Sequence, residues 1–214
     1  MTVEFYLDYL CPKCYIQHKV LEDMVQHKKI EAGDIIYRSY EMVYHEQFDQ
    51  HMTFIDFIAK YKHLPVDEVI AFLNDQNINI NLFPIHNVHK MAHLAKKENK
   101  SFAYSKAVFK AIYEDHLDLS DNELLRCVAA NVGLNNQAIE EVLTTDLYSN
   151  AVISNKENAQ LKGVLDLPFI RINRHVKLSG LSDEFDIIAA FNQERLGHHE
   201  YCVGENCERS RKVC

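Results

Sequence analysis

The chain has 214 residues and a formal net charge of −8, with 23 Lys and Arg against 31 Asp and Glu. Its 47% hydrophobic residues and only 6 Gly and 4 Pro allow a sizeable core, which excludes disordered, collagen-like and low-complexity chains. The acidic balance argues against nucleic acid and membrane partners, and no apolar run approaches the ~18 residues of a membrane span.

The first residues, MTVEFYLDYLC, include two acids, no basic residue and no small-residue cleavage site. They resemble neither a signal peptide nor a transit peptide, so we expect a cytoplasmic protein. In such a chain, six cysteines indicate redox or metal chemistry more than a structural disulfide framework. These cysteines are Cys11, Cys14, Cys127, Cys202, Cys207 and Cys214.

Residues 3–40 have the pattern of a β-α-β unit. Apolar and polar residues alternate over residues 3–8, which predicts a short strand that ends just before Cys11. From Pro12 the apolar residues recur at helical spacing, and proline suits the first helical turn. Residues 35–37 then indicate a second buried strand, which the crossover makes parallel to the first.

The middle of the chain is predicted to be helical almost throughout, up to a helix over about 147–162 that stops at Gly163. Within it, Ser120 and Glu123 predict a capping box. Cys127 falls in the apolar stripe of the same helix, so we expect a buried packing thiol. The scattered histidines, including those at 45, 86 and 89, are expected to be solvated or satisfied within the fold.

The pattern returns to sheet near the end. Apolar residues at 169–172 and 176–178 flank a turn-like Asn173-Arg174-His175, which predicts an antiparallel hairpin, and Ser182 opens a last helix. We therefore predict an α/β chain with a thioredoxin-like fold and an inserted all-helical domain. The expected divisions are 1–45 and 148–196 for the thioredoxin-like parts, 46–147 for the insertion, and 197–214 for a cysteine-containing tail.

The chemistry-bearing motif is Cys11-Pro12-Lys13-Cys14, at a strand-to-helix junction. Unpaired N–H groups and the helix dipole at this position stabilise a thiolate, so Cys11 is predicted to attack disulfides and Cys14 to resolve them. Lys13 is expected to add a positive charge that favours the Cys11 thiolate. The alternatives are half of a zinc site and a pair of inert buried thiols.

Two distant features support this interpretation. Pro168 opens the predicted hairpin where thioredoxin-like folds carry a cis-proline beside the dithiol, and Leu167 would offer its N–H and C=O to a substrate strand. An ordinary trans proline is the alternative. Asp8 is interpreted either as the acid that shuttles the proton of Cys14 or as a solvated residue at the end of the strand.

These residues resemble the DsbA-like thioredoxin family, specifically its FrnE-like branch, through the motif DYLCPKCYIQ at residues 8–17. The similarity runs through residues 3–195. Its other motifs are Asn87 to Ala95, Ala107 to Tyr113, Leu119-Ser120-Asp121, Val132-Gly133-Leu134, residues 159–164, Leu167-Pro168 and Leu178-Ser179-Gly180. The resemblance implies a thioredoxin fold with a helical insertion and thiol–disulfide oxidoreductase activity through Cys11 and Cys14.

The sequence departs from that family at two places. The family usually has an aromatic residue or His where Lys13 stands, so its redox potential does not carry over. The family's Gly-Val-Pro is replaced by Asp166-Leu167-Pro168, which changes the expected shape of the substrate groove. Related branches that act on glutathione conjugates or isomerise chromene carboxylates have serine in place of the first motif cysteine, and here both cysteines are present.

The tail contains a second cysteine pair, Cys202 and Cys207. FrnE-like proteins can carry such a pair in a C-terminal extension, so the resemblance suggests an auxiliary redox couple that exchanges disulfides with Cys11 and Cys14. Two alternatives stay open: a mobile tail with exposed thiols, and a zinc site. The ligands of that zinc site would be His198, His199, Cys202, Cys207 and Cys214.

The predicted activity is thiol–disulfide exchange with protein or small-molecule disulfides. It needs no organic cofactor, we expect no metal at the motif, and glutathione is a candidate co-substrate. A non-catalytic adaptor that holds a client in the groove is one alternative, and a glutathione-dependent transferase or isomerase is the other.

Overall fold

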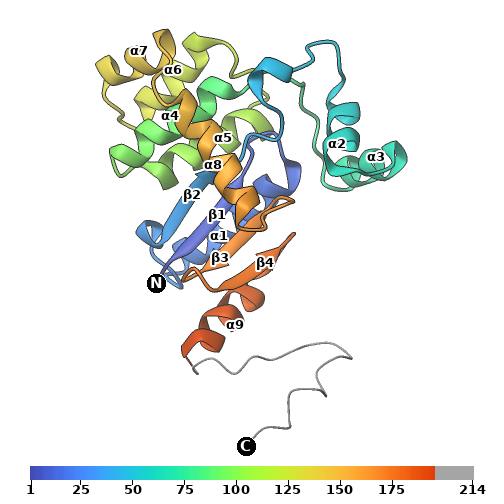
Figure 1. Cartoon of the computed structure of the whole chain (residues 1–214), viewed down its shortest axis with the longest axis vertical. Helices are drawn as coiled ribbons and strands as arrows, with labels where there is room; N and C mark the ends of the chain where they lie inside the picture. The colour runs from blue at the N-terminus through green and yellow to red at the C-terminus, as the bar shows by residue number, and fades with distance from the viewer. Residues whose placement is uncertain (196–214) are drawn as a thin grey trace, which may run out of the picture.

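The computed structural model describes residues 1–195, and the sheet at its centre has the strand order β2-β1-β3-β4 (Figure 1). The strands are β1 (Val3–Leu7), β2 (Ile35–Ser39), β3 (Phe169–Ile172) and β4 (Val176–Ser179). β1 is parallel to β2 and antiparallel to β3, and β3 pairs antiparallel with β4. The predicted β-α-β unit and hairpin are both confirmed.

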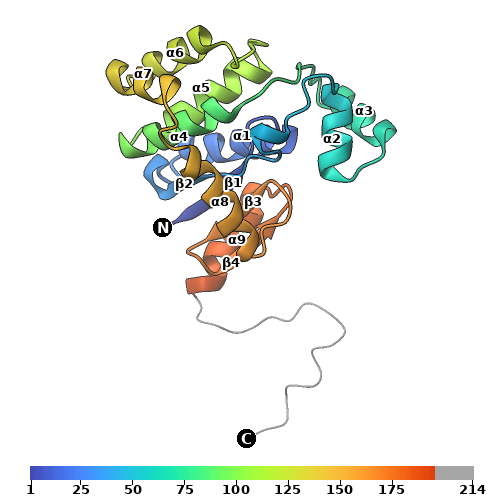
Figure 2. The same cartoon turned by 45° about the horizontal axis from the view of Figure 1, so that its top comes forward.

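Nine α-helices are described. They are α1 (Pro12–Gln26), α2 (Phe54–Lys62), α3 (Val66–Asp75), α4 (His86–Lys97), α5 (Ser101–Tyr113), α6 (Asn122–Asn131), α7 (Asn136–Thr144), α8 (Ser149–Leu161) and α9 (Glu184–Arg195). In both views α2 and α3 form a pair set to one side of the group α4 to α7 (Figures 1 and 2). None of the described helices is long and apolar enough to cross a membrane. The α/β fold with helices between β2 and β3 confirms the predicted fold class.

Helices cover both faces of the sheet, which buries the central strand completely. α1 contacts α9, which packs on β3 and β4, while α8 contacts β2 and α4. The apolar residues of β1, such as Phe5, are buried, and so are Glu4 and Tyr6 on the opposite face. The alternation in the sequence therefore marks two different buried faces rather than a buried and a solvated one.

Glu4 occupies a buried position because two arginines from the flanking strands pair with it. Arg38 Nη2 of β2 lies 2.6 Å from Glu4 Oε1, and Arg171 Nε of β3 lies 2.6 Å from Glu4 Oε2. Burial would raise the pKa of Glu4, but the hydrogen bonds and charges of the two arginines outweigh it and lower that pKa. The trio therefore ties three strands together across the sheet.

We expect Glu4→Gln to lower the free energy of unfolding at neutral pH by about 2–3 kcal/mol, since it leaves two half-buried guanidinium groups without a counter-charge. Because the pKa of Glu4 is lower in the folded chain than in the unfolded chain, the ionised carboxylate stabilises the fold at pH values above the unfolded pKa. This stabilisation is lost as the pH falls through the folded pKa. Urea titrations at neutral and acid pH would measure it. The exposed Glu46→Gln is the control, and equal stability of both variants would contradict the assignment.

One buried histidine, His18, and one half-buried histidine, His93, give the fold a second pH dependence. Burial lowers the pKa of His18 to about 3 and that of His93 to about 4. The unfolded chain, with histidine pKa values near 6.5, binds more protons than the folded chain between about pH 4 and 6.5. The contribution of the two neutral imidazoles to the free energy of unfolding is therefore complete above that window, and it decreases as the pH falls through the window.

Near pH 5 each histidine is expected to contribute a slope of about 1.4 kcal/mol per pH unit to the free energy of unfolding. His18→Gln and His93→Gln should each remove about that slope in urea titrations across the window. The exposed His51→Gln should leave the slope unchanged. An undiminished slope in the first two variants would show that their imidazoles titrate normally in the folded state.

Two predictions within α6 are wrong. The helix is capped by Asp121, whose side chain accepts the N–H of Glu123, and Ser120 instead bonds to Asp118. Cys127 is exposed rather than buried. Leu125 and Ala129, one position off the predicted stripe, are the buried residues, because α6 turns that row toward its neighbours.

Candidate functional site

The first motif cysteine is the N-cap of α1, where the chain leaves β1. Cys11 N–H donates to Asp8 O at 3.1 Å, which forms the turn between strand and helix, and Cys14 N–H donates to Cys11 O at 2.9 Å. Pro12 occupies the first helical turn, where no N–H partner is needed. Both thiols are buried, each with 0% exposure, so burial does not distinguish Cys14 from Cys11.

The two thiols differ in acidity despite equal burial. Burial acts to raise the pKa of Cys11, but hydrogen bonding by the thiol and N–H of Cys14 and the charge of Lys62 outweigh it, and the pKa is lowered. For Cys14, burial is again the largest effect and raises the pKa. The neighbouring Cys11 raises it further, so the pKa of Cys14 lies well above the ordinary value. The pKa values of the two thiols are therefore shifted in opposite directions.

The cation at the site is Lys62, the last residue of α2. Its Nζ donates to Asp166 Oδ1 at 2.6 Å and to Leu167 O at 2.5 Å, and its side chain is 7% exposed. Burial acts to lower the pKa of Lys62, yet the two cysteines and Asp166 raise it, so the ammonium keeps its charge. A helix outside the β-α-β unit therefore supplies the positive charge that acts to lower the pKa of Cys11.

The sequence predicts this charge from Lys13, but the structure places that side chain elsewhere. Lys13 Nζ lies over the ring of Phe72 in α3, 5.8 Å from the ring centroid. The positive charge that lowers the pKa of Cys11 is that of Lys62. The ammonium group of Lys13 is therefore directed at α3.

The loop before β3 lies against Cys11. The Leu167–Pro168 peptide bond is cis, and Cys11 Sγ is 4.0 Å from Leu167 O. The backbone groups expected to bind a substrate strand are engaged within the chain: Leu167 N–H donates to Asp166 Oδ1 at 2.7 Å, and its carbonyl accepts from Lys62. A substrate strand would have to displace these contacts.

Asp8 is buried, 1% exposed, so the interpretation as a solvated strand-end acid is wrong. Its carboxylate accepts the N–H of Leu10 and the N–H of Met42, both at 2.6 Å, which holds the segment after β2 against the motif turn. The negative charge of Asp8 acts to raise the pKa of Cys11, whereas the positive charge of Lys62 acts to lower it. His89 Nε2 lies 3.9 Å from Asp8 Oδ2.

The site contains Lys62, which no sequence motif indicates, and His89, which the sequence predicts to be solvated or satisfied within the fold. The sequence offers no signal for Lys62, because it comes from a distant helix and its partner is the loop at 166–167. His89 is fully buried, and within the described residues neither of its ring nitrogens has a hydrogen-bond partner. The predicted tail residues Cys202, Cys207 and Cys214, with His198 and His199, lie outside the described residues.

Comparisons with known proteins agree with this architecture. Residues 2–191 match the model of the DSBA-like thioredoxin domain. YwbO of Bacillus subtilis is 22% identical over 157 residues, which cover 69% of this chain and 74% of YwbO. A probable DsbA oxidoreductase from Streptomyces coelicolor has a TM-score of 0.78 at 19% identity, covering 92% of this chain and 91% of that one. A 2-hydroxychromene-2-carboxylate isomerase has a TM-score of 0.67 at 19% identity, covering 91% and 96%.

Proposed function

Because the chain belongs to the DSBA-like thioredoxin domain family, whose members are generally thiol–disulfide oxidoreductases, we propose that it exchanges disulfides through Cys11 and Cys14. The observation that carries the proposal is the opposite direction of the two thiol pKa values at one helix N-terminus. A nucleophile must be a thiolate, and a resolving thiol must stay protonated until the mixed disulfide has formed.

The reaction conserves electrons between the two partners. The Cys11 thiolate attacks one sulfur of a substrate disulfide, the second sulfur leaves as a thiolate, and a mixed disulfide forms on Cys11. Cys14 then loses its proton and attacks Cys11 Sγ, which expels the remaining substrate thiolate. The substrate gains two electrons and the Cys11–Cys14 pair loses two, and the reverse sequence oxidises a dithiol.

The substrate is a protein or small-molecule disulfide, as in the FrnE-like branch that the motif resembles, with glutathione as co-substrate and no organic cofactor. Leu167 and Pro168 support this proposal because the carbonyl of Leu167 already lies beside the reacting sulfur. A strand that displaced Lys62 from that carbonyl would place its own disulfide at Cys11. Since Cys11 has 0% exposure, binding must open the surface around it.

The test is to equilibrate the full chain in a series of glutathione buffers and to map its disulfides by mass spectrometry. We expect a Cys11–Cys14 disulfide whose fraction follows the glutathione potential with a two-electron dependence. A pair that stays reduced in every buffer would overturn the proposal. Clients retained without turnover would then favour an adaptor, and conversion of a glutathione conjugate would favour the transferase or isomerase alternative.

A further inference from the structure

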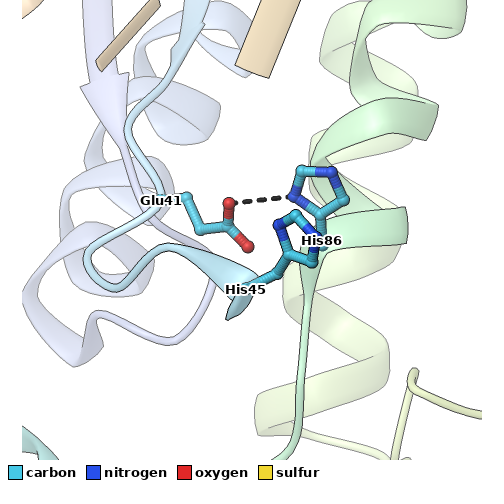
Figure 3. A group of neighbouring side chains, drawn as sticks. All are labelled: Glu41, His45 and His86. Carbon is cyan, nitrogen blue, oxygen red and sulfur yellow. Dashed lines mark hydrogen bonds and ion pairs between the residues drawn. The ribbon is translucent and has the colours of Figure 1, made fainter. Parts of the chain in front are cut away.

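Three side chains converge at a place that the thiol chemistry does not use (Figure 3). Glu41 follows β2, His45 lies in the short 3-10 turn His45–Gln47, and His86 begins α4. Their ligand atoms all lie within 4.8 Å of one another. Glu41 Oε2 is 2.9 Å from His86 Nδ1, and the two imidazole rings are stacked with centroids 4.2 Å apart.

We propose that Glu41, His45 and His86 bind a divalent transition-metal ion of the zinc type. Two imidazole nitrogens and a carboxylate oxygen form the ligand set of open zinc sites, in which water takes the fourth position. Metal–ligand bonds of about 2.0–2.2 Å separate the ligand atoms of a tetrahedral site by roughly 3.4 Å. Small side-chain rotations would bring the ligand atoms of Glu41, His45 and His86 from their present distances of up to 4.8 Å to that separation. A set of nitrogen and oxygen donors without thiolate suits Zn²⁺, Ni²⁺ or Cu²⁺ better than Cu⁺.

Contacts around the cluster hold its ligand side chains in position. His86 Nε2 lies 3.1 Å from Ser149 Oγ, the first side chain of α8, so the second nitrogen of the ring has the outer partner that metal-binding histidines usually have. Glu41 is 3% exposed, and a buried carboxylate needs a positive partner. A metal ion held jointly with His86 would provide one.

Lys156, whose charge interacts with that of Glu41, does not take this role. Lys156 Nζ donates to Met42 O at 2.9 Å and lies 3.8 Å from the ring centroid of Tyr44. Its ammonium group is therefore directed at the backbone and the ring, and no ion pair joins it to Glu41 among the described residues. The carboxylate is left facing the two imidazoles, as Figure 3 shows.

A metal ion at this position would join three parts of the chain that are distant in sequence. Glu41 and His45 belong to the segment after β2, His86 to α4, and its partner Ser149 to α8. The next residue of that segment, Met42, donates its N–H to Asp8 beside the thiols. The ion would thus stabilise the segment that donates a hydrogen bond to Asp8, without contacting the two thiols.

Titration of the full-length protein with Co²⁺ tests the site and separates it from cysteine ligation. Thiolate ligands give an intense ultraviolet charge-transfer band, whereas imidazole and carboxylate ligands give only weaker visible bands. We expect one equivalent that binds with visible bands alone, both when the cysteines are reduced and when they are oxidised. Competition by Zn²⁺ should displace it.

His45→Ala is the primary variant because that side chain is exposed and its loss leaves the core intact. It is expected to weaken binding of this equivalent by at least about 100-fold, and Ser149→Ala by about 10- to 100-fold. His51→Ala, an exposed histidine of the same segment, is the matched control and should bind like the original protein. Unchanged affinity in His45→Ala, or visible bands that appear only with the thiolate band, would overturn the proposal.

Discussion

Replacing Cys11 with Ser is expected to abolish disulfide exchange, with a loss of at least about 10³-fold, because a hydroxyl cannot replace the thiolate as nucleophile. Cys14→Ser should behave differently. Its Cys11 thiolate can still attack, but nothing resolves the product, so a mixed disulfide should accumulate on Cys11. Reduction of a disulfide-linked peptide, followed by mass spectrometry of the trapped adducts, would measure both outcomes.

Cys127→Ser is the matched control for both variants, since Cys127 is an exposed cysteine of α6. It should exchange disulfides at the original rate. A trapped adduct on Cys14 in the Cys11→Ser variant, formed as fast as the expected adduct on Cys11, would reverse the roles given to the two sulfurs. Retained turnover in Cys11→Ser would remove this pair from the mechanism.

Lys62→Met has the second large expected effect. Losing the buried ammonium should raise the pKa of Cys11, because burial then acts without the positive charge that opposes it. The less stabilised thiolate should shift the potential of the pair toward the reducing side, by about 30 mV for each 1.4 kcal/mol of thiolate stabilisation lost. Equilibration with glutathione and a pH profile of Cys11 alkylation would give the two values.

The rate of exchange gives a sharper test of Lys62. At neutral pH the exchange rate of Lys62→Met should fall only about 3- to 10-fold. A Cys11 thiol of higher pKa is ionised in a smaller fraction of molecules, but each thiolate is more nucleophilic. At a pH above both pKa values the variant should react faster than the original protein. Lys60→Met, an exposed lysine of the same helix, is the control, and Lys13→Met should also leave the pKa of Cys11 nearly unchanged. A merely structural role for Lys62 would slow the reaction at every pH.

The local parts of this site could be predicted from the sequence. The strand that ends before Cys11, the helix that begins at Pro12 and the hairpin after Pro168 follow from residue periodicity and from turn and cap preferences over short stretches. The identity of the cation could not be predicted. Lys13 is adjacent in sequence, whereas Lys62 reaches the site only because α2 packs its end against the loop at 166–167.

The same limit explains the errors at Cys127 and the omission of the histidine cluster. Apolar residues of α6 allow two adjacent stripes, and only the packing of its neighbours decides that Leu125 and Ala129 face inward. His45 and His86 show no ligand spacing, because the segment after β2 and the start of α4 meet only in the folded chain. Periodicity predicts elements, while contacts between elements decide which side chains meet.

The central claim is that Cys11 is the thiolate of the pair, and the ultraviolet absorbance of the thiolate tests it most directly. The measurement is the pH titration of the reduced full-length protein minus that of its Cys11→Ser variant, which isolates one sulfur among the six cysteines. We expect an inflection below the pKa of about 8.5 of an ordinary cysteine. An inflection at or above that value, or a difference spectrum without one, would contradict the mechanism.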